Sequence, residues 1–290
     1  MKPVDLVWYE GALRPAGEAG PALDDRGFLY GEGAFETIRL ADSRPYRLVA
    51  HLDRLRVTLA DLEIPWSYPE SEVGQGFRDL AVRHGLAEGV GRILVSAGPR
   101  GADPPWAAPS RSFTWLTVGP LPAPPPEGGV PVVISVLPQL PASPTSRHKS
   151  LAYLERVHVR REAHRRGAWE AVRLTPEGYL AEGAMSNLFW GVGGILRTPM
   201  LDLGVLPGVT RQAIGEAVRH LGVTLVEGHF TPTELALAEE AFLTNAVAGL
   251  VPIARLGDWI PARVPGPLCE QLRRAEAAAL QAFRSGPGGA

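Results

Sequence analysis

The clearest candidate for chemistry in this sequence is a single interior lysine. Lysine occurs only at Lys2, beside the first methionine, and at Lys149, in the stretch "PTSRHKSLAYLE". Because lysine and arginine together number 29, 29 − 2 leaves 27 arginines. Burial can lower the pKa of a lysine until the neutral amine attacks carbonyl groups, which an arginine cannot do. Lys149 is therefore a candidate for Schiff-base chemistry, although chance retention of a surface lysine fits the count equally well.

The motifs of most other common sites are missing from the sequence. None of the seven histidines falls in an HExxH or other i,i+4 ligand pair, so we predict no metal site. The run "GEGAFE" at residues 31–36 lacks the third glycine of a dinucleotide-binding fingerprint. Neither a GxxxxGKS/T phosphate loop nor a GxSxG nucleophile elbow occurs. These observations exclude the commonest nucleotide-binding and hydrolase classes.

Composition and charge are those of an ordinary globular protein. The 290 residues are 45% hydrophobic, which is enough for two packed domains. The formal net charge is −2, so we expect no general attraction to nucleic acid or to a membrane. The one basic cluster, "RVHVRREAHRRG" at 156–167, is more typical of a solvated helix face than of a phosphate-binding face. The expected partner is a small molecule.

Cysteine usage and hydropathy indicate a reducing compartment. Cys269 is the only cysteine, so no disulfide can form within the chain. The opening "MKPVDLVWYEG" lacks the apolar core of a signal peptide, and no run of about 18 apolar residues occurs. We predict a cytoplasmic protein.

Two sets of elements must position these residues. In the first, strands are expected at 5–9 and 27–40, helices at 48–62 and about 70–86, and two β-rich runs at "GRILVSAG" and "SFTWLTVGPL". In the second, a strand at "VVISVLPQL" is followed by a helix at about 149–166, a hairpin at 169–183 and strands at "NLFWGV" and "GILRTP". A helix over 210–221, a strand at 223–227, a short helix at 231–238, a strand at 240–244 and a helix at 265–283 complete the chain. The pattern predicts an α+β fold.

The proline-rich stretch "GPLPAPPPEGGVP" resists both helix and sheet, and this makes it the predicted linker. The expected organisation is a small N-terminal α/β domain at 1–118, the linker at 119–131, a larger β-rich C-terminal domain with helices at 132–284 and a disordered tail at 285–290.

Six segments in register resemble one known family over about residues 5–260. They are "DDRGFLYGEGAFETIRL", "AHLDRL", "HKSLAYLERV", "LTPEGYLAEGAMSNLFWG", "LPGVTRQAI" and "AFLTNAVAGLVPI". Their order is similar to that of the class IV (fold type IV) pyridoxal-phosphate enzymes, which include branched-chain aminotransferases, D-amino-acid transaminases and aminodeoxychorismate lyase. The resemblance implies a two-domain fold, pyridoxal 5′-phosphate in the cleft between domains, and a homodimer.

The resemblance also implies roles for individual residues. Lys149 matches the lysine that forms the internal aldimine and moves the proton between Cα and C4′. Glu182 matches the carboxylate paired with the pyridine nitrogen. Asn187 of the same motif is also predicted to bind the cofactor. An adjacent anion keeps that nitrogen protonated, which makes the ring a better electron sink.

Further matches concern the cofactor phosphate and the ring hydroxyl. Arg54 matches the arginine that grips the phosphate, and its alternative reading is an exposed helix arginine. Val209 and Thr210 follow a glycine turn that opens a helix, where backbone amides and the helix dipole favour an anion. Thr244 matches another phosphate ligand, and Tyr153 matches a tyrosine that bonds the ring hydroxyl.

Within the family, "EGAMSNLFW", "FETIRL" and "LERV" are most similar to aminodeoxychorismate lyase. Such an enzyme converts 4-amino-4-deoxychorismate into 4-aminobenzoate and pyruvate for folate biosynthesis. Thr37 lies where a lyase threonine assists proton transfer, although a plain β-branched strand residue fits equally well.

An aminotransferase acting on branched-chain or other amino acids with 2-oxoglutarate is the alternative. D-amino-acid transaminases have a motif similar to "TRGxxxRxH" near the substrate carboxylate. Here Ala97 stands in place of the first arginine and no histidine follows Arg100. Branched-chain enzymes usually read "FEGIR", whereas Thr37 replaces that glycine here. Arg92 and Arg100 are the candidates for binding a substrate carboxylate, with surface arginine as the default interpretation.

Overall fold

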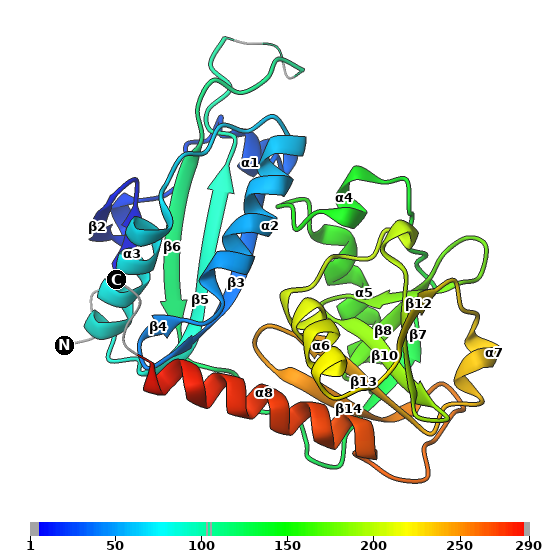
Figure 1. Ribbon diagram of the computed structural model, residues 1–290. Coiled ribbons are helices and arrows are strands. Elements are labelled where there is room, and N and C mark those ends of the chain that lie inside the picture. The colour runs from blue at the N-terminus through cyan, green and yellow to red at the C-terminus, as the bar shows by residue number, and fades with distance from the viewer. Residues whose placement is uncertain (1–5, 103, 105, 287–290) are drawn as a thin grey trace. The chain divides into compact units, whose positions relative to one another are not determined.

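The computed structural model describes residues 6–102, 104 and 106–286 (Figure 1), and these form two compact units. The N-terminal unit comprises residues up to 122 together with 148–153 and the chain from 280 onward. The C-terminal unit comprises residues 123–147 and 154–279. The division at Pro122 falls inside the predicted linker, while the predicted domain boundaries themselves stay a prediction.

The N-terminal unit is built on a six-stranded sheet in the order β2-β1-β6-β5-β3-β4. Its strands are β1 (Leu6–Tyr9), β2 (Ala12–Pro15), β3 (Gly33–Ala41), β4 (Arg44–Pro45), β5 (Glu88–Ser96) and β6 (Phe113–Gly119). Its helices before residue 122 are η1 (Ala16–Glu18), α1 (Arg26–Tyr30), α2 (Leu48–Asp61) and α3 (Glu70–Arg83). Every neighbouring pair of strands in this sheet is antiparallel.

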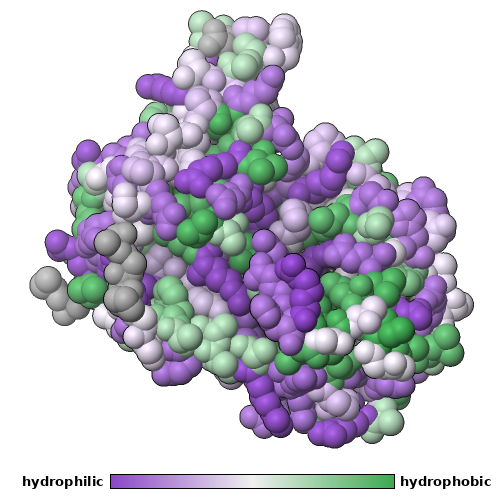
Figure 2. Space-filling view, in the orientation of Figure 1, coloured by the Kyte–Doolittle hydropathy of each residue, from purple (hydrophilic) through white to green (hydrophobic). Residues whose placement is uncertain are grey.

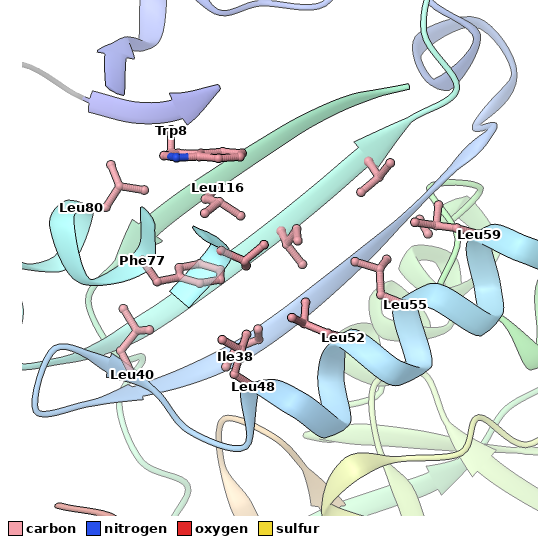
Figure 3. Packing of buried hydrophobic residues seen from close by; sticks show 14 of the residues in the cluster. Trp8, Ile38, Leu40, Leu48, Leu52, Leu55, Leu59, Phe77, Leu80 and Leu116 are labelled. Carbon is pink, nitrogen blue, oxygen red and sulfur yellow. The ribbon is translucent and has the colours of Figure 1, made fainter. Parts of the chain in front are cut away.

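One face of this sheet is covered by α2 and α3. Of the leucines that helical spacing predicts on one face, Leu48, Leu52, Leu55 and Leu59 lie in the core and point at the sheet (Figure 3). Leu62, the fifth, follows the end of α2 and packs partly buried against the same core. Phe77 and Leu80 of α3 meet the same core. On β3 the even-numbered positions 34, 36, 38 and 40 are buried toward these helices, because side chains alternate between the two faces of a strand. The odd-numbered positions of β3 therefore belong to the opposite face.

The predicted strand at 27–40 is wrong in its first part. Residues 26–30 form the short helix α1, and β3 begins at Gly33. The carboxylate of Asp25 accepts a hydrogen bond from the amide of Phe28, and Gly31 ends the helix at φ 69°. This capping chemistry outweighs the β-favouring aromatic residues of the run, since a side-chain cap and a left-handed glycine satisfy the end groups of one helical turn.

The C-terminal unit contains an eight-stranded sheet in the order β12-β11-β10-β13-β14-β7-β8-β9, with a further pairing of β9 to β10. The strands are β7 (Val130–Ile134), β8 (Glu170–Leu174), β9 (Leu180–Gly183), β10 (Asn187–Val192), β11 (Ile195–Pro199), β12 (Leu225–Gly228), β13 (Glu240–Asn245) and β14 (Gly249–Leu256). The helices are α4 (Pro144–Arg147), α5 (Leu154–Arg165), η2 (Leu201–Leu203), α6 (Val209–His220), α7 (Pro232–Leu235) and α8 (Pro267–Ser285), whose last turns belong to the N-terminal unit. The mixture of helices and sheets confirms the predicted α+β class.

Two predicted elements of this half need correction, and one strand was not predicted. The helix expected at 149–166 begins only at Leu154, because residues 149–151 pair with β3 instead. Strand β14 lies at 249–256, where no strand was predicted. Of the predicted disordered tail, Ser285 is the last residue of α8, and 287–290 lie outside the described residues.

The surface mixes polar and apolar residues. On the face in view in Figure 2, hydrophilic and hydrophobic residues are interspersed. Within the described part of the chain, no helix combines the length and the apolar character needed to cross a membrane.

Candidate active site

Lys149 is held against strand β3 of the N-terminal unit. Its carbonyl oxygen accepts a hydrogen bond of 2.8 Å from the amide of Phe35, and the next residues continue the pairing through Leu151 and Gly33. The side chain is half-buried, and its Nζ lies 4.4 Å from the centroid of the Phe35 ring and 5.9 Å from that of Tyr153. The two rings meet edge to face at 5.1 Å. The amine thus lies within cation–π distance of two aromatic rings.

Thr37 and Arg92 lie on the face of the sheet that Phe35 shares. Side chains alternate along β3, so Thr37 follows Phe35 on this face at about 7 Å along the strand. In the ladder between β3 and β5, Thr37 is directly opposite Arg92. The side chain of Arg92 is exposed. The structure therefore brings the predicted lysine, tyrosine, threonine and one arginine to one face of the N-terminal sheet.

Arg100 does not join this row. It lies in the connection between β5 and β6, where its backbone amide donates to the carbonyl of Asp24 at 3.0 Å. The neighbouring Pro99 forms an isolated bridge with Asp25. Of the two arginines predicted to bind a substrate carboxylate, only Arg92 is on the strand face of Thr37.

Arg54 lies on α2 and is fixed by a buried carboxylate. Its Nε donates to Glu36 Oε1 at 2.8 Å and its second guanidinium nitrogen to Oε2 at 2.6 Å. Nδ1 of His51 lies 2.8 Å from the same Oε2. Because the Arg54 side chain is only 11% exposed, it is not an exposed helix arginine. The bidentate pair gives this guanidinium a single orientation.

The interaction of Glu36 with Arg54 and His51 shifts the pKa of the Glu36 carboxyl and of the His51 ring. Burial alone would raise the pKa of the Glu36 carboxyl, but the charge of Arg54 and hydrogen bonds from His51 and Arg54 lower it to about 2. Burial lowers the pKa of His51, against the opposing effect of Glu36. Sequence reasoning missed Glu36 and His51. The available signal was a carboxylate at a core position of "AFETIRL", which requires a buried cationic partner.

Glu182 of β9 is the centre of a buried polar cluster in the C-terminal unit. Its Oε1 accepts a hydrogen bond of 2.7 Å from Arg156 of α5. Its Oε2 accepts from the amide side chain of Asn187 at 3.1 Å and from the backbone amide of Leu206 at 3.0 Å. A carboxylate offers about four lone-pair positions, so three of them are used by these donors. Only 1% of Glu182 is exposed, so its carboxylate is buried.

The opening of α6 carries a second polar constellation. Asn187 is directly opposite Thr244 in the ladder between β10 and β13. A Cβ atom at Gly208 would lie only 2.0 Å from Asn187 Oδ1, so this N-cap position requires glycine. No side chain caps α6, whose first residues are Val209 and Thr210. The hydroxyl of Thr244 is buried without a hydrogen-bond partner. Uncapped helix amides beside an unpaired hydroxyl suit an anion.

The predicted residues are thus divided between the two units. Lys149, Thr37, Tyr153, Arg54, Arg92 and Arg100 belong to the N-terminal unit, and Glu182, Asn187, Val209, Thr210 and Thr244 belong to the C-terminal unit. Among the described residues, no group of three or more His, Cys, Asp or Glu side chains could hold a metal ion.

Comparison with known proteins shows the family of this chain. The family model described as amino-transferase class IV matches residues 33–256. The chain belongs to the class IV aminotransferase family. This family depends on pyridoxal 5′-phosphate, in agreement with the predicted resemblance and cofactor.

Relatives of this class IV chain include proteins named for two activities. It is 32% identical over 254 residues to the aminodeoxychorismate lyase of Bacillus subtilis, with 87% of this chain and 86% of that protein aligned. The structure of a putative 4-amino-4-deoxychorismate lyase from Legionella pneumophila matches with a TM-score of 0.84 at 26% identity, over 90% of this chain and 95% of that one. The structure of the Escherichia coli branched-chain amino acid aminotransferase matches with a TM-score of 0.86 at 27% identity, over 95% of this chain and 94% of that one.

Proposed function

We propose that this class IV enzyme is a pyridoxal-phosphate-dependent aminodeoxychorismate lyase, which converts 4-amino-4-deoxychorismate into 4-aminobenzoate and pyruvate. The observation that carries the proposal is the pairing of Thr37 with Arg92 on the strand face that Phe35 shares beneath the Lys149 amine. A hydroxyl and a guanidinium on this strand face would provide a proton relay and a carboxylate ligand. The 32% identity to the Bacillus subtilis lyase supports the same choice.

The residues of the C-terminal unit fit the cofactor. Thr244 Oγ1 is a buried hydroxyl that lacks a partner, and a phosphate oxygen would supply one. The uncapped amides of Val209 and Thr210 would hold further phosphate oxygens. Glu182 has about one lone-pair position left for the N–H of the cofactor ring. We assign Arg54 to the phosphate and Tyr153 to the ring hydroxyl on the strength of the family motifs.

Pyridoxal phosphate, when bound, supplies an aldehyde that condenses with amines and a ring that accepts the electron pair left by a lost proton. The Lys149 amine would hold the cofactor and then remove the proton from the substrate carbon that bears nitrogen. Thr37 would orient that proton transfer, and Arg92 would bind a substrate carboxylate. Loss of this proton, cleavage of the ether C–O bond and release of pyruvate leave an aromatic ring. The reaction is a balanced elimination that requires no oxidant and no second substrate.

An aminotransferase for branched-chain or other amino acids with 2-oxoglutarate is the second candidate. The observation that favours it is the match to the Escherichia coli branched-chain enzyme over 95% of this chain. Arg92 would then bind a carboxylate of 2-oxoglutarate instead. Thr37 argues against this candidate. Its β-branched side chain takes up more space on the strand face of Phe35 and Arg92 than the glycine that branched-chain enzymes usually have there.

A product assay separates the two candidates. Purified protein loaded with pyridoxal phosphate is mixed with 4-amino-4-deoxychorismate, and 4-aminobenzoate and pyruvate are measured. The proposal expects both products in equal amounts. Rapid conversion of the cofactor to its pyridoxamine form by L-leucine or D-alanine, without 4-aminobenzoate from aminodeoxychorismate, would establish the aminotransferase instead.

The proposal includes a cellular role. A lyase of this kind would supply 4-aminobenzoate to folate biosynthesis in the cytoplasm. We also propose a homodimer, which sedimentation of the cofactor-loaded protein would test.

A further inference from the structure

Three arginines surround the carboxylate of Glu182. Arg156 of α5 donates to Oε1 at 2.7 Å, and Arg173 of β8 lies 3.9 Å from the same oxygen. Arg211 of α6 also interacts electrostatically with Glu182, although its own ion pair is with Glu227 at 2.7 Å. Glu182 therefore faces cations on three neighbouring elements.

Arg156 does more than neutralise charge. Besides Glu182, its guanidinium donates to the carbonyl of Ala184 at 3.2 Å and to that of Ser146 at 3.1 Å. Only 7% of Arg156 is exposed. The planar guanidinium thus fixes the β9–β10 turn and the segment before Lys149 at the same time that it fixes Glu182. Such a geometry gives Glu182 one position and one orientation.

Arg173 is the less satisfied of the two closest cations. It is 1% exposed, its side chain bonds to Glu155, and its Nε and second terminal nitrogen lack hydrogen-bond partners. Burial, followed by repulsion from Arg156, lowers the pKa of Arg173. The carboxylate of Glu155 is 48% exposed, so water screens its charge more than that of Glu182. The field of Arg173 at Glu182 is therefore only partly cancelled.

The charges of the cluster formed by Glu182, Arg156, Arg173 and Glu155 sum to zero. Two guanidinium groups balance two carboxylates. A protonated ring nitrogen at Glu182 would add a positive charge in a place where Glu182 and Arg173 are at most 2% exposed. Unbalanced buried charge is costly, so this cluster opposes the extra proton more than a lone carboxylate would.

We propose that Arg156 and Arg173 are positioning residues that reduce the effective negative charge of Glu182, so that the cofactor ring nitrogen is less strongly protonated than a lone carboxylate would make it. This inference rests on the proposed pyridoxal-phosphate site. It assigns to these arginines a control over how far the ring withdraws electrons from the substrate.

The test is the ¹⁵N chemical shift of pyridoxal phosphate labelled at its ring nitrogen and bound to the protein at neutral pH. Replacing Arg156→Met or Arg173→Met removes one cation and keeps an apolar stem of similar length. The expected result is an upfield shift toward the protonated form, equivalent to about a tenfold change in the protonation equilibrium. The conservative Arg156→Lys keeps the charge and should stay near the wild-type shift.

Arg166→Gln is the matched control, because Arg166 is also ion-paired on the C-terminal unit, to Glu162 at 2.8 Å. It should leave the ¹⁵N shift unchanged. If Arg156→Met does not fold, Arg173→Met decides, since the only side-chain hydrogen bond of Arg173 among the described residues is to Glu155. An unchanged shift in the arginine variants that bind cofactor overturns the inference. Failure of the wild-type protein to bind cofactor would instead contradict the proposed function.

Discussion

The surroundings of Lys149 and of Glu182 differ in almost every physical respect. Lys149 is half-buried between two aromatic rings on the face of a sheet. Glu182 is buried and accepts three hydrogen bonds, with Arg173 as a further cation at 3.9 Å. In the proposed function the Lys149 amine exchanges partners and carries a proton, which requires room to move. In the same proposal the Glu182 carboxylate orients the cofactor ring and acts on its nitrogen, and such a group is best held rigidly. The contrast predicts that damage at the first site appears in activity and damage at the second in stability.

The sharpest test of the first half of this contrast is Lys149→Ala. Loss of the amine should lower lyase activity by about 10⁴-fold, because both covalent attachment and proton transfer depend on it. Since the side chain is half-buried and contacts ring faces, the unfolding midpoint in urea should change little. Initial rates and urea unfolding of the same preparation measure both quantities. Retained activity above roughly a tenth of wild type would break the comparison.

Glu182→Ala, unlike Lys149→Ala, should lower the free energy of unfolding strongly. Removing the carboxylate leaves the buried Arg156 and Arg173 without this partner, which costs about 4 kcal/mol of unfolding free energy. Urea unfolding of the cofactor-free protein isolates this cost from cofactor binding. Arg166→Gln, at a 46% exposed side chain, is the control and should cost less than about 1 kcal/mol. Equal costs for the two variants would contradict the buried network.

The buried Glu36 adds a pH dependence to the N-terminal unit. Its pKa of about 2 lies below the ordinary value of 4.5. The contribution of Glu36 to the free energy of unfolding is therefore complete above pH 4.5 and is lost as the pH falls toward 2. The shift corresponds to about 3 kcal/mol. The lowered pKa of His51 acts in the same direction, since the unfolded chain binds a proton there below 6.5. Glu36→Gln should flatten the acid limb of the curve of unfolding free energy against pH. An unchanged slope would exclude this role for Glu36.

The smallest expected effect concerns Thr244. Thr244→Val removes a buried hydroxyl that has no partner in the described part of the protein, so the cofactor-free protein should be equally stable or slightly more stable. Affinity for pyridoxal phosphate should fall by about tenfold, which is the worth of one hydrogen bond to a charged group. Titration followed by absorbance measures the affinity. Unchanged affinity would remove Thr244 from the phosphate site.

Periodic patterns and local turn chemistry made much of the fold predictable. The leucines of α2 repeat at helical spacing, and the 169–183 hairpin and strand β10 lie where alternation and turn residues placed them. Residues 149–153 were predicted as helix because their composition permits it. Their pairing with β3 depends on a strand more than 100 residues away in the sequence, and no local pattern reports that contact.

The candidate site was predictable where motifs carry it and not where partners come from tertiary packing. Motif order predicts Lys149, Glu182 and Thr244 as site residues, and their roles stay predictions. Arg156 was assigned to a solvated helix face, which is wrong, because the fold turns it inward to Glu182. The residues that neighbour an arginine in the sequence do not show whether its side chain faces water or a buried carboxylate.

The central claim is that the Lys149 amine carries the cofactor. Protein saturated with pyridoxal phosphate is reduced with borohydride and digested, and its peptides are weighed by mass spectrometry. The account predicts a reduced cofactor adduct on the peptide that contains Lys149 and on no other peptide. An unmodified Lys149 peptide, or an adduct at the other lysine, Lys2, would contradict it.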